Sequence, residues 1–224
     1  MLTVFTQYWW QFLVVCIVGY LVGATNFAIL FSRLIKLQDV RKFGSGNAGS
    51  TNMFRVYGLS MGLLTFFCDA LKSVVCIFLS KWIFASSMET QALTQLMYTV
   101  GLFVIVGHVL PVYYNFRGGK GVAPSIGCMF SLQPILALCL VLPLFLLVLI
   151  FDRTSVGSIA LAIIVLVLSW VMVLPKTDLV CAICLTLIFL LVLFAHRGNI
   201  ARLLSGKEKR MGLTKAILGK KDKK

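Results

Sequence analysis

The chain has 224 residues, of which 60% are hydrophobic and only 12% are charged, and its formal net charge is +14. Soluble globular domains average about 25% charged residues, so this composition excludes that class and indicates an integral membrane protein. The apolar stretches leave no room for a detachable soluble module. We therefore expect one integral-membrane domain over residues 1–224, with a basic tail from about residue 207 to 224.

Six long apolar stretches are candidate membrane spans, at residues 8–31, 59–84, 93–114, 122–151, 155–174 and 179–195. About 20 residues suffice to cross the hydrocarbon. The fourth stretch is longer than that, and Gln133-Pro134 divides it because proline removes a helix donor. The sequence thus predicts an all-α polytopic membrane protein with about seven transmembrane helices. Five is the alternative, since the first half of the divided stretch is short.

The distribution of basic residues predicts the orientation of the chain in the membrane. Eighteen of the 21 Lys and Arg residues fall in segments 32–58, 115–121, 152–154 and 196–224. Cytoplasmic loops carry an excess of Lys and Arg, so these segments are expected inside, with the N-terminus outside and the C-terminus cytoplasmic. Contact with anionic lipid headgroups then explains the positive charge, and no nucleic-acid recognition fold is evident.

The first polar motif, residues 44–55, follows the first apolar stretch. Its three glycines allow successive backbone N–H groups to converge on an anion, and Arg55 adds a bidentate cation. Neutral hydrogen-bonding side chains accompany them: Ser45, Asn47, Thr51 and Asn52. The motif predicts a phosphate cradle, with a flexible polar loop as the alternative.

The second motif begins at His108, near the end of an apolar stretch, and closes with Gly118-Gly119-Lys120-Gly121. Glycine amides at a helix N-terminus, together with one lysine, form an anion site through donor geometry and helix dipole. The motif is not a Walker A loop, because Gly121 stands where Ser or Thr would follow the lysine. The motif therefore does not favour a nucleoside triphosphatase, and a short charged turn remains the alternative.

The third motif, residues 196–202, lies at the expected cytoplasmic end of the last span. His196 and Asn199 are three residues apart and share a helix face, and Glu208 follows in the tail. Within the second span, Asp69 and Lys72 are also three residues apart, so they can pair and lower the cost of holding either charge in lipid. We expect this pair to have a supporting role, and His108 to reach the same surface as Lys120.

Segments 44–55, 108–123 and 196–208, with the Asp69 to Lys72 pair, resemble the bacterial membrane glycerol-3-phosphate acyltransferases that use acyl phosphate as acyl donor. The resemblance covers nearly the whole chain in order and spacing. Two positions depart from the family pattern: Ser50 stands where Ala is commoner, and Pro124 where Thr is usual.

The resemblance implies transfer of a fatty acyl group to the sn-1 hydroxyl of glycerol 3-phosphate, giving lysophosphatidic acid and phosphate, the first step of phospholipid synthesis. It implies essential roles for Ser45 and Arg55, supporting roles for His196 and Asn199, and a mainly structural role for Glu208. It also implies a glycerol 3-phosphate site at the glycine-lysine loop, formed by Gly118, Gly119, Lys120 and Gly121. The expected location is the bacterial plasma membrane, with the active site on the cytoplasmic side.

The residues themselves agree with this chemistry. Both reactants are anionic, so cations and amide groups must gather at one place to bring them together. The sequence shows no nucleophile-base-acid triad, and direct attack by the glycerol hydroxyl is expected, with His196 or a substrate phosphate accepting its proton. The H-x-x-x-x-D acyltransferase signature is absent, since Tyr113 and Ala201 occupy the fifth position after the two histidines. No metal or cofactor pattern is present, and no protein partner is indicated.

A transporter for an organic phosphate or another anion is the competing class. Interrupted apolar segments and an intramembrane charge pair are typical of such proteins. The polar motifs, however, are expected at one surface and not at the membrane midplane, and no internal repeat is evident. The sequence therefore favours the enzyme.

Overall fold

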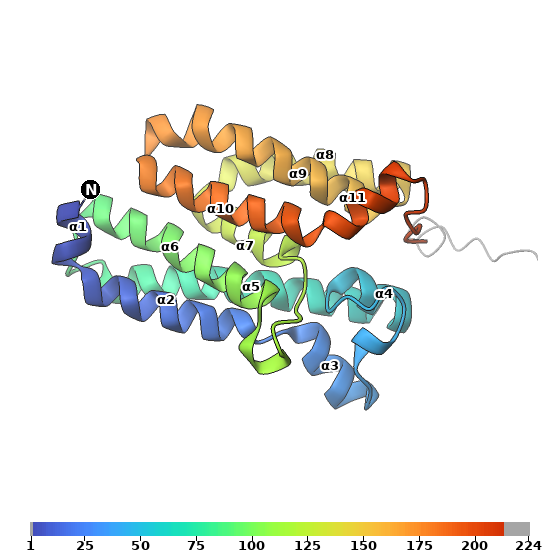
Figure 1. Ribbon diagram of the computed structural model, residues 1–224. Helices are drawn as coiled ribbons and strands as arrows, with labels where there is room; N and C mark the ends of the chain where they lie inside the picture. Colours follow the sequence, from blue (N-terminus) through green and yellow to red (C-terminus); the bar gives the residue numbers. More distant parts are fainter. Residues whose placement is uncertain (1, 213–224) are drawn as a thin grey trace, which may run out of the picture.

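A computed structural model describes residues 2–212. Residues 213–224, which form most of the predicted basic tail, lie outside the described part. The described residues form helices and connecting loops (Figure 1): α1 Leu2–Gln7, α2 Trp9–Ala24, α3 Phe27–Lys36, η1 Val40–Lys42, α4 Ser50–Tyr57, α5 Leu59–Phe84, α6 Thr90–Val109, η2 Val112–Tyr114, α7 Val122–Leu132, α8 Pro134–Phe151, α9 Thr154–Leu168, η3 Ser169–Val173, η4 Leu174–Lys176, α10 Leu179–Ala195 and α11 Arg197–Leu204.

Five segments of the described chain are long and apolar enough to cross a membrane: Trp9–Lys36, Leu59–Phe84, Thr90–Tyr114, Pro134–Phe151 and Thr154–Lys176. A sixth is formed if α10 and α11, which meet at an angle of 55°, count as one broken span. Helix α7 has 11 residues and is shorter than a full crossing. The protein is thus an all-α bundle with about five candidate spans, and the predicted count of seven would require α7 and α10 as further crossings.

Several predicted boundaries are confirmed. Helices α5 and α10 have the predicted bounds, and α7 ends at Leu132 immediately before Gln133, with Pro134 opening α8. Proline is favoured at the first turn of a helix because its missing N–H would have no partner there. The first stretch, expected as one span, is part of one candidate span, Trp9–Lys36, within which α2 ends and α3 begins at Asn26, whose side chain accepts a hydrogen bond from the Ile29 amide and caps α3.

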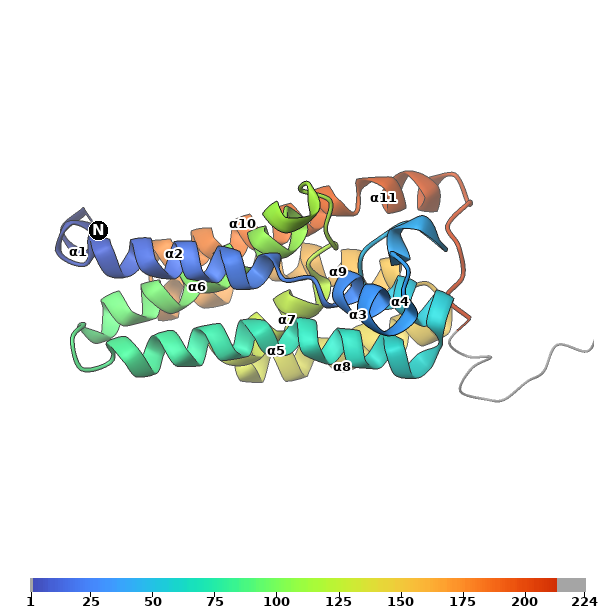
Figure 2. The same ribbon diagram turned by 90° about the horizontal axis from the view of Figure 1, so that it is seen from below.

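The close packing of α2 against α6 depends on two glycines. A Cβ atom on Gly23 would overlap the backbone of Val104, and one on Gly107 would overlap the carbonyl of Tyr20. Small residues let membrane helices approach closely, since lipid provides no hydrophobic force to join them. In Figures 1 and 2 the two helices run side by side. This contact holds the C-terminal end of α2 against α6.

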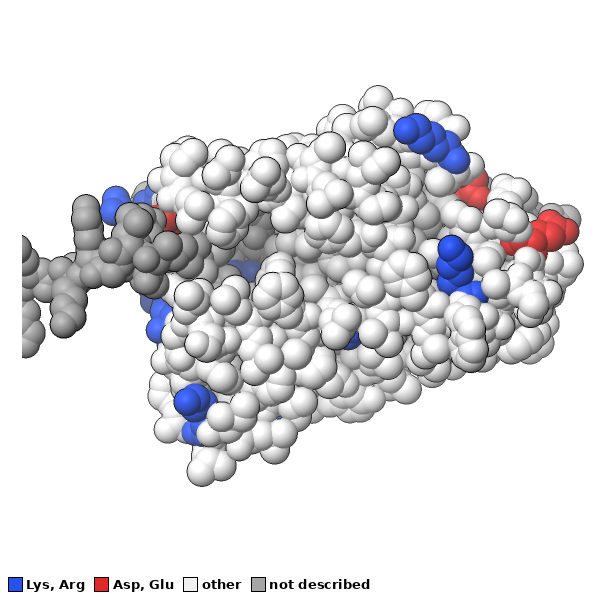
Figure 3. Space-filling view, turned by 180° about the vertical axis from the view of Figure 1, so that it is seen from behind, with Lys and Arg blue, Asp and Glu red and all other residues white. Residues whose placement is uncertain are grey.

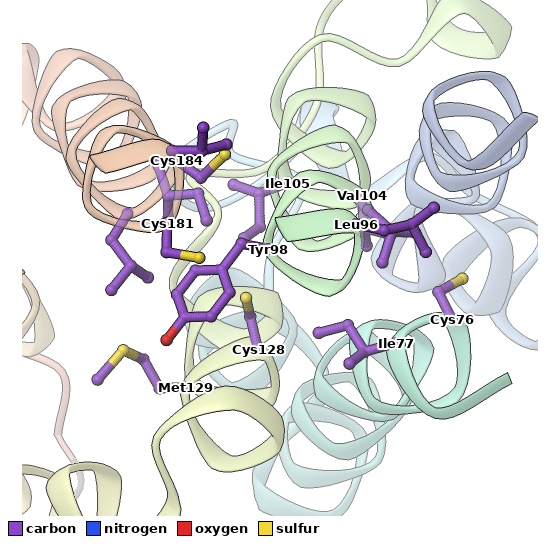
Figure 4. Close-up of a cluster of buried hydrophobic side chains, with 14 of the residues drawn as sticks. Cys76, Ile77, Leu96, Tyr98, Val104, Ile105, Cys128, Met129, Cys181 and Cys184 are labelled. Carbon is purple, nitrogen blue, oxygen red and sulfur yellow. The ribbon is translucent and has the colours of Figure 1, made fainter. Parts of the chain in front are cut away.

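The apolar core surrounds α6, whose Tyr98 is 2% exposed. In Figure 4 the Tyr98 ring lies between the sulfur atoms of Cys128 on α7 and Cys181 on α10. Its hydroxyl accepts a hydrogen bond from Gln133 Nε2 at 2.6 Å, so this buried polar group is satisfied at the division between α7 and α8. The cysteines of the core are free thiols that fill space between helices, as the sequence indicates.

The outer surface matches a protein that faces lipid. Figure 3 shows a largely uncharged face, with Lys, Arg, Asp and Glu drawn mainly toward the two ends of the bundle. Long apolar side chains cover the middle; Leu71 on α5 and Leu138 on α8, for example, are more than half exposed. In water such a surface would aggregate, but in a bilayer it is the expected one. The same face carries a hollow near one end, with Lys or Arg atoms visible inside it (Figure 3).

Candidate active site

All three polar motifs line one cavity of about 1010 Å³ at the end of the bundle where α4 and α11 lie (Figure 1). Eleven of the predicted site residues contribute to its walls: Ser45, Asn47, Asn52, Arg55, Asp69, His108, Lys120, Gly121, His196, Asn199 and Glu208. Three others, Gly118, Gly119 and Lys72, are not among the lining residues. Segments as far apart in the sequence as Ser45 and Glu208 therefore meet around one space.

Four helices begin at the wall of this cavity. The first residues of α4, α7, α9 and α11 line it: Ser50 and Thr51, Val122 and Ala123, Thr154 and Ser155, and Arg197 and Gly198. The first N–H groups of a helix have no partner within the helix, and the helix dipole places partial positive charge there. The cavity therefore has backbone groups as well as side chains of the kind that can hold an anion.

The loop of the first motif is held in shape by Asn52. This side chain is fully buried; its Oδ1 accepts from the Ser45 amide at 2.8 Å, and its Nδ2 donates to the carbonyls of Val40 and Phe43, both at 3.1 Å. Gly44 has φ +62°, and a Cβ there would overlap Asn52 Oδ1. Because these hydrogen bonds occupy the amide, Asn52 shapes the loop, while Ser45 and Asn47 are placed at the cavity.

In the second motif the first two glycine amides already have partners. The Gly118 amide donates to the carbonyl of Val109 at 3.3 Å, and the Gly119 amide donates to that of His108 at 3.1 Å. These bonds fold the loop back on the end of α6. The next residues of the motif, Lys120 and Gly121, are the ones that line the cavity. A phosphate at this turn would therefore meet the Lys120 side chain and the N-terminal amides of α7.

A chain of hydrogen bonds joins the second motif to the third. Lys120 Nζ donates to Asn199 Oδ1 at 2.5 Å, and Asn199 Nδ2 donates to Glu208 Oε1 at 2.6 Å. The same carboxylate accepts from Ser155 Oγ and from Arg202 Nε, each at 2.8 Å. Glu208 thus links α9 and α11 below the Lys120 side chain, which is consistent with the structural role that the resemblance implies.

The electrostatics of the cavity favour a negatively charged occupant. Burial is the main reason why the pKa of Lys120 falls to about 8; Glu208 opposes this shift, and the guanidinium groups of Arg202 and Arg55 add to it. Burial alone would raise the pKa of Glu208, but hydrogen bonds from Asn199, Ser155 and Arg202 outweigh that effect and lower it. Within residues 2–212, Arg55 makes no ion pair with a carboxylate.

His196 stands at the bend between α10 and α11. Its Nδ1 lies 2.8 Å from the carbonyl oxygen of Val192, and the ring is 3% exposed. A carbonyl oxygen only accepts hydrogen bonds, so Nδ1 carries the proton and Nε2 of the neutral ring has a free lone pair. Because His196 lines the cavity, this nitrogen is available to accept a proton or a hydrogen bond from an occupant.

The expected pair of Asp69 and Lys72 is confirmed and is part of a larger cluster. Lys72 Nζ lies 3.0 Å from Asp69 Oδ1 and 2.9 Å from His108 Nδ1. It also donates to the carbonyls of Gly23 and Thr25, both at 2.9 Å, at the end of α2. Buried charges are tolerated when they are paired and hydrogen-bonded. The cluster joins α2, α5 and α6 beneath the cavity.

The other half of the cavity is apolar. Its walls come from one face of α5 and one face of α8: Leu59, Gly62, Leu63 and Phe66, and Val141, Leu144, Phe145 and Val148. Along α5 the lining reaches from Leu59 to Asp69, a rise of about 15 Å at 1.5 Å per residue. That is about half the thickness of the hydrocarbon, so the cavity reaches from the polar end toward the bilayer centre.

Sequence reasoning missed three groups that shape the site. Asn26 Nδ2 donates to the Ala48 carbonyl at 3.1 Å and anchors the first motif, and Ser155 binds Glu208. After α11 the chain returns across the cavity mouth: Lys209 and Met211 line it, and the Gly212 amide donates to Asp152 Oδ1 at 2.9 Å. Of these groups, only Asn26 was indicated by the sequence, because an asparagine inside an apolar stretch usually caps a helix or hydrogen-bonds to a partner.

Comparison with known proteins agrees with this geometry. The family described as "Glycerol-3-phosphate acyltransferase" matches residues 13–206. The chain is 36% identical over 196 residues to the glycerol-3-phosphate acyltransferase of Finegoldia magna, covering 88% of this chain and 94% of that protein. It is also 36% identical over 200 residues to that of Staphylococcus aureus strain Newman, covering 88% and 96%.

Two solved structures are similar over almost the whole chain. Both are of PlsY (YgiH), an integral membrane glycerol 3-phosphate acyltransferase, and both are 31% identical to this chain. The glycerol 3-phosphate form has a TM-score of 0.80 and covers 92% of this chain and 98% of that one. The lysophosphatidic acid form has a TM-score of 0.77, covering 93% and 99%. The chain therefore belongs to the glycerol-3-phosphate acyltransferase family.

Proposed function

We propose that this acyltransferase moves a fatty acyl group from acyl phosphate to the sn-1 hydroxyl of glycerol 3-phosphate, giving lysophosphatidic acid and phosphate. Its relatives are glycerol-3-phosphate acyltransferases, and PlsY has been solved in forms with glycerol 3-phosphate and with lysophosphatidic acid. These two compounds are the acceptor and the product of the proposed reaction. Such a transfer is the first committed acylation in making a phospholipid.

One observation carries the proposal: a single cavity is cationic at one end and apolar at the other. Arg55, Lys120 and four helix N-termini meet at the polar end, whereas side chains of α5 and α8 form the apolar end. Two phosphate-bearing reactants fit the first part, and an aliphatic chain fits the second. A membrane transporter for a small water-soluble anion would not need a cavity whose apolar half is this long.

The chemistry needs positioning more than it needs a covalent intermediate. In acyl phosphate the acyl carbon already carries phosphate as a good leaving group, so the glycerol hydroxyl can attack it directly. The new ester C–O bond forms while the bond from the acyl carbon to the phosphate oxygen breaks, and phosphate leaves with the electron pair. Lys120, Arg55 and the helix amides would stabilise the negative charge on both phosphates.

The hydroxyl proton has two acceptors in this scheme. His196 Nε2 has a free lone pair, because Nδ1 donates to Val192. A phosphate oxygen of a bound substrate is the other acceptor. We propose that Ser45 and Asn199 orient the reactants beside these groups, with Asn47 as a further contact to substrate, because all three line the polar end.

We further propose seven crossings, with the N-terminus outside and the C-terminus in the cytoplasm of a bacterial cell. Helices α2, α5, α6, α7, α8, α9 and α10 alternate in direction along the bundle in Figures 1 and 2, and α7 starts at the cavity as a short crossing. The cavity lies at the end of the bundle that carries the basic segments, so the positive-inside rule places the reaction at the cytoplasmic face of the plasma membrane. The whole chain would then act as one integral-membrane catalytic unit.

The test is turnover by the purified protein in detergent, with acyl phosphate and labelled glycerol 3-phosphate. We expect labelled lysophosphatidic acid from the wild type, and a loss of roughly a hundredfold or more in Ser45→Ala and Arg55→Ala. Lys42→Ala is the matched control, because Lys42 is an exposed cation of the same loop region that does not line the cavity. Detergent solution has no compartments, so product formation excludes a transporter, while its absence from active-site-intact protein contradicts the proposal.

A further inference from the structure

His108 has different surroundings at its two ring nitrogens. On one side, Nδ1 lies 2.9 Å from Lys72 Nζ and 3.4 Å from Asp69 Oδ1. On the other side, Nε2 faces Gly119, since a Cβ atom placed on that glycine would overlap it. The ring is 3% exposed and lines the substrate cavity.

The hydrogen-bond partners of Lys72 determine which ring nitrogen of His108 carries the proton. An ammonium group has three hydrogens and no lone pair, so it only donates. Its four neighbours are the carbonyls of Gly23 and Thr25, Asp69 Oδ1, and His108 Nδ1. Three hydrogens serve four acceptors only if one hydrogen is shared, and Nδ1 is as close to the ammonium, at 2.9 Å, as the two carbonyls are, whereas it lies 3.4 Å from the carboxylate. This proximity favours Nδ1 as an acceptor from Lys72 over Nδ1 as a donor to Asp69. The neutral ring therefore carries its hydrogen on Nε2.

That N–H group is left for an occupant of the cavity. Within residues 2–212, Nε2 has no hydrogen-bond partner, although the ring is almost completely buried. Nε2 is not among the fully enclosed side-chain atoms that lack a partner, so it keeps some accessible surface, and the cavity that His108 lines is where a ligand acceptor can reach it. Lys120, the residue after Gly119, whose amide donates to the His108 carbonyl, lines the same cavity.

We propose that His108 is a substrate-binding residue, whose Nε2–H donates a hydrogen bond to a phosphate oxygen of glycerol 3-phosphate or of the acyl donor. Lys72 is the positioning residue that keeps the proton on Nε2, and Asp69 balances its charge. Gly119 has no side chain because a larger residue would cover the donor. The inference rests on the proposed function, because it takes the phosphate group of a substrate as the acceptor.

The chain contains an internal reference for this tautomer. It has two histidines, and the structure assigns them opposite tautomers: His196 has its proton on Nδ1, which donates to Val192, and His108 has it on Nε2. Nitrogen-15 spectra of histidine-labelled enzyme distinguish the two tautomers. A His108→Gln variant assigns the two sets of signals.

The experiment titrates the labelled wild-type enzyme with glycerol 3-phosphate, and separately with a non-reacting acyl phosphonate. We expect the Nε2–H signal of His108 to shift in one arm, and that arm identifies which phosphate it binds. A His108 ring with its proton on Nδ1, or signals that move in neither arm while both compounds demonstrably bind, would overturn the inference. Turnover of the same sample tests the proposed function separately: an active enzyme with an unresponsive His108 overturns only the inference, whereas an inactive one overturns both.

Kinetics provide a second readout. His108→Leu removes the donor, and we expect the KM of the affected substrate to rise roughly ten- to a hundredfold, as for loss of a hydrogen bond to a charged group. His108→Gln keeps an N–H donor and should recover part of that loss. Lys72→Met should move the proton of His108 to Nδ1, where Asp69 accepts it, and raise the same KM. Equal KM values in wild type and His108→Leu would contradict the proposal.

Discussion

The Nζ atom of Lys120 lies 2.5 Å from Oδ1 of Asn199, a residue 79 positions later in the chain. This contact joins the glycine-lysine loop to the start of α11, and Asn199 passes the connection on to Glu208 through its Nδ2. One amide side chain therefore holds a cation on one side and a carboxylate on the other. Its removal should affect both motifs together.

We expect Asn199→Leu, which is similar in volume but has no polar atoms, to lower kcat/KM roughly ten- to a hundredfold. The physical reason is that Lys120 and Glu208 each lose a hydrogen-bond partner, at about 1–3 kcal/mol per group. Steady-state kinetics in detergent measure the effect, and thermal unfolding in the same detergent separates it from loss of fold. Unchanged kcat/KM in a folded variant would show that the contact does not support catalysis.

The lowered pKa of Lys120 predicts a basic limb in the pH profile. Below about pH 8 the side chain is charged and attracts phosphate; above it the charge is lost, so kcat/KM for glycerol 3-phosphate should fall as the pH rises. The substrate phosphate is already a dianion there, since its second pKa is about 6. Lys120→Arg keeps its charge at all these pH values, so its profile should stay level. A falling limb in this variant would assign the titration to another group.

His196→Gln tests which group accepts the proton of the glycerol hydroxyl. If Nε2 is the base, its loss should lower kcat by roughly a hundredfold or more and remove the acid limb of the pH profile, because glutamine takes up no proton. The measurement is kcat against pH for the two proteins. An acid limb that persists unchanged rules out histidine and assigns the proton to a substrate phosphate.

Two adjacent leucines of α5 offer a matched test of the apolar half of the cavity. Leu63 lines the cavity, whereas Leu64 does not, and their exposed fractions are similar at 46% and 43%. We expect Leu63→Trp to lower kcat/KM for long acyl chains at least about tenfold and to spare short ones, because pocket volume limits methylene binding. Leu64→Trp should leave the chain-length profile unchanged. Equal profiles in both variants would place the acyl chain elsewhere.

The bundle was largely predictable, because apolar length determines where helices cross a bilayer. The bounds of α5 and α10 and the division at Gln133 follow from this rule, and the pairing of Asp69 with Lys72 follows from helix periodicity. The break before α3 was not predicted, since the apolar pattern continues through Thr25. Asn26 was the one indication of it, since its cap on the Ile29 amide is local, whereas its other hydrogen bond, to the Ala48 carbonyl, exists only in the folded chain.

The site was predictable by residue type but not by the role of each group. Glycine loops and scattered cations indicate an anion site, yet the amides of Gly118 and Gly119 are used within the loop, and Asn52 is used to shape the first motif. Such assignments depend on which acceptor lies nearest in space. The same holds for Ser155, whose contact with Glu208 joins segments 53 residues apart.

The apolar half of the cavity, whose walls come from α5 and α8, also affects how rates for this enzyme should be expressed. A reactant that reaches it from the membrane is drawn from the leaflet, where its effective concentration is a mole fraction among neighbouring amphiphiles, while the polar reactant comes from bulk solution. Adding inert detergent at fixed total amounts would then slow turnover by surface dilution. In saturation curves, the concentration of the membrane reactant should therefore be given per membrane area, and that of the polar reactant per volume of solution.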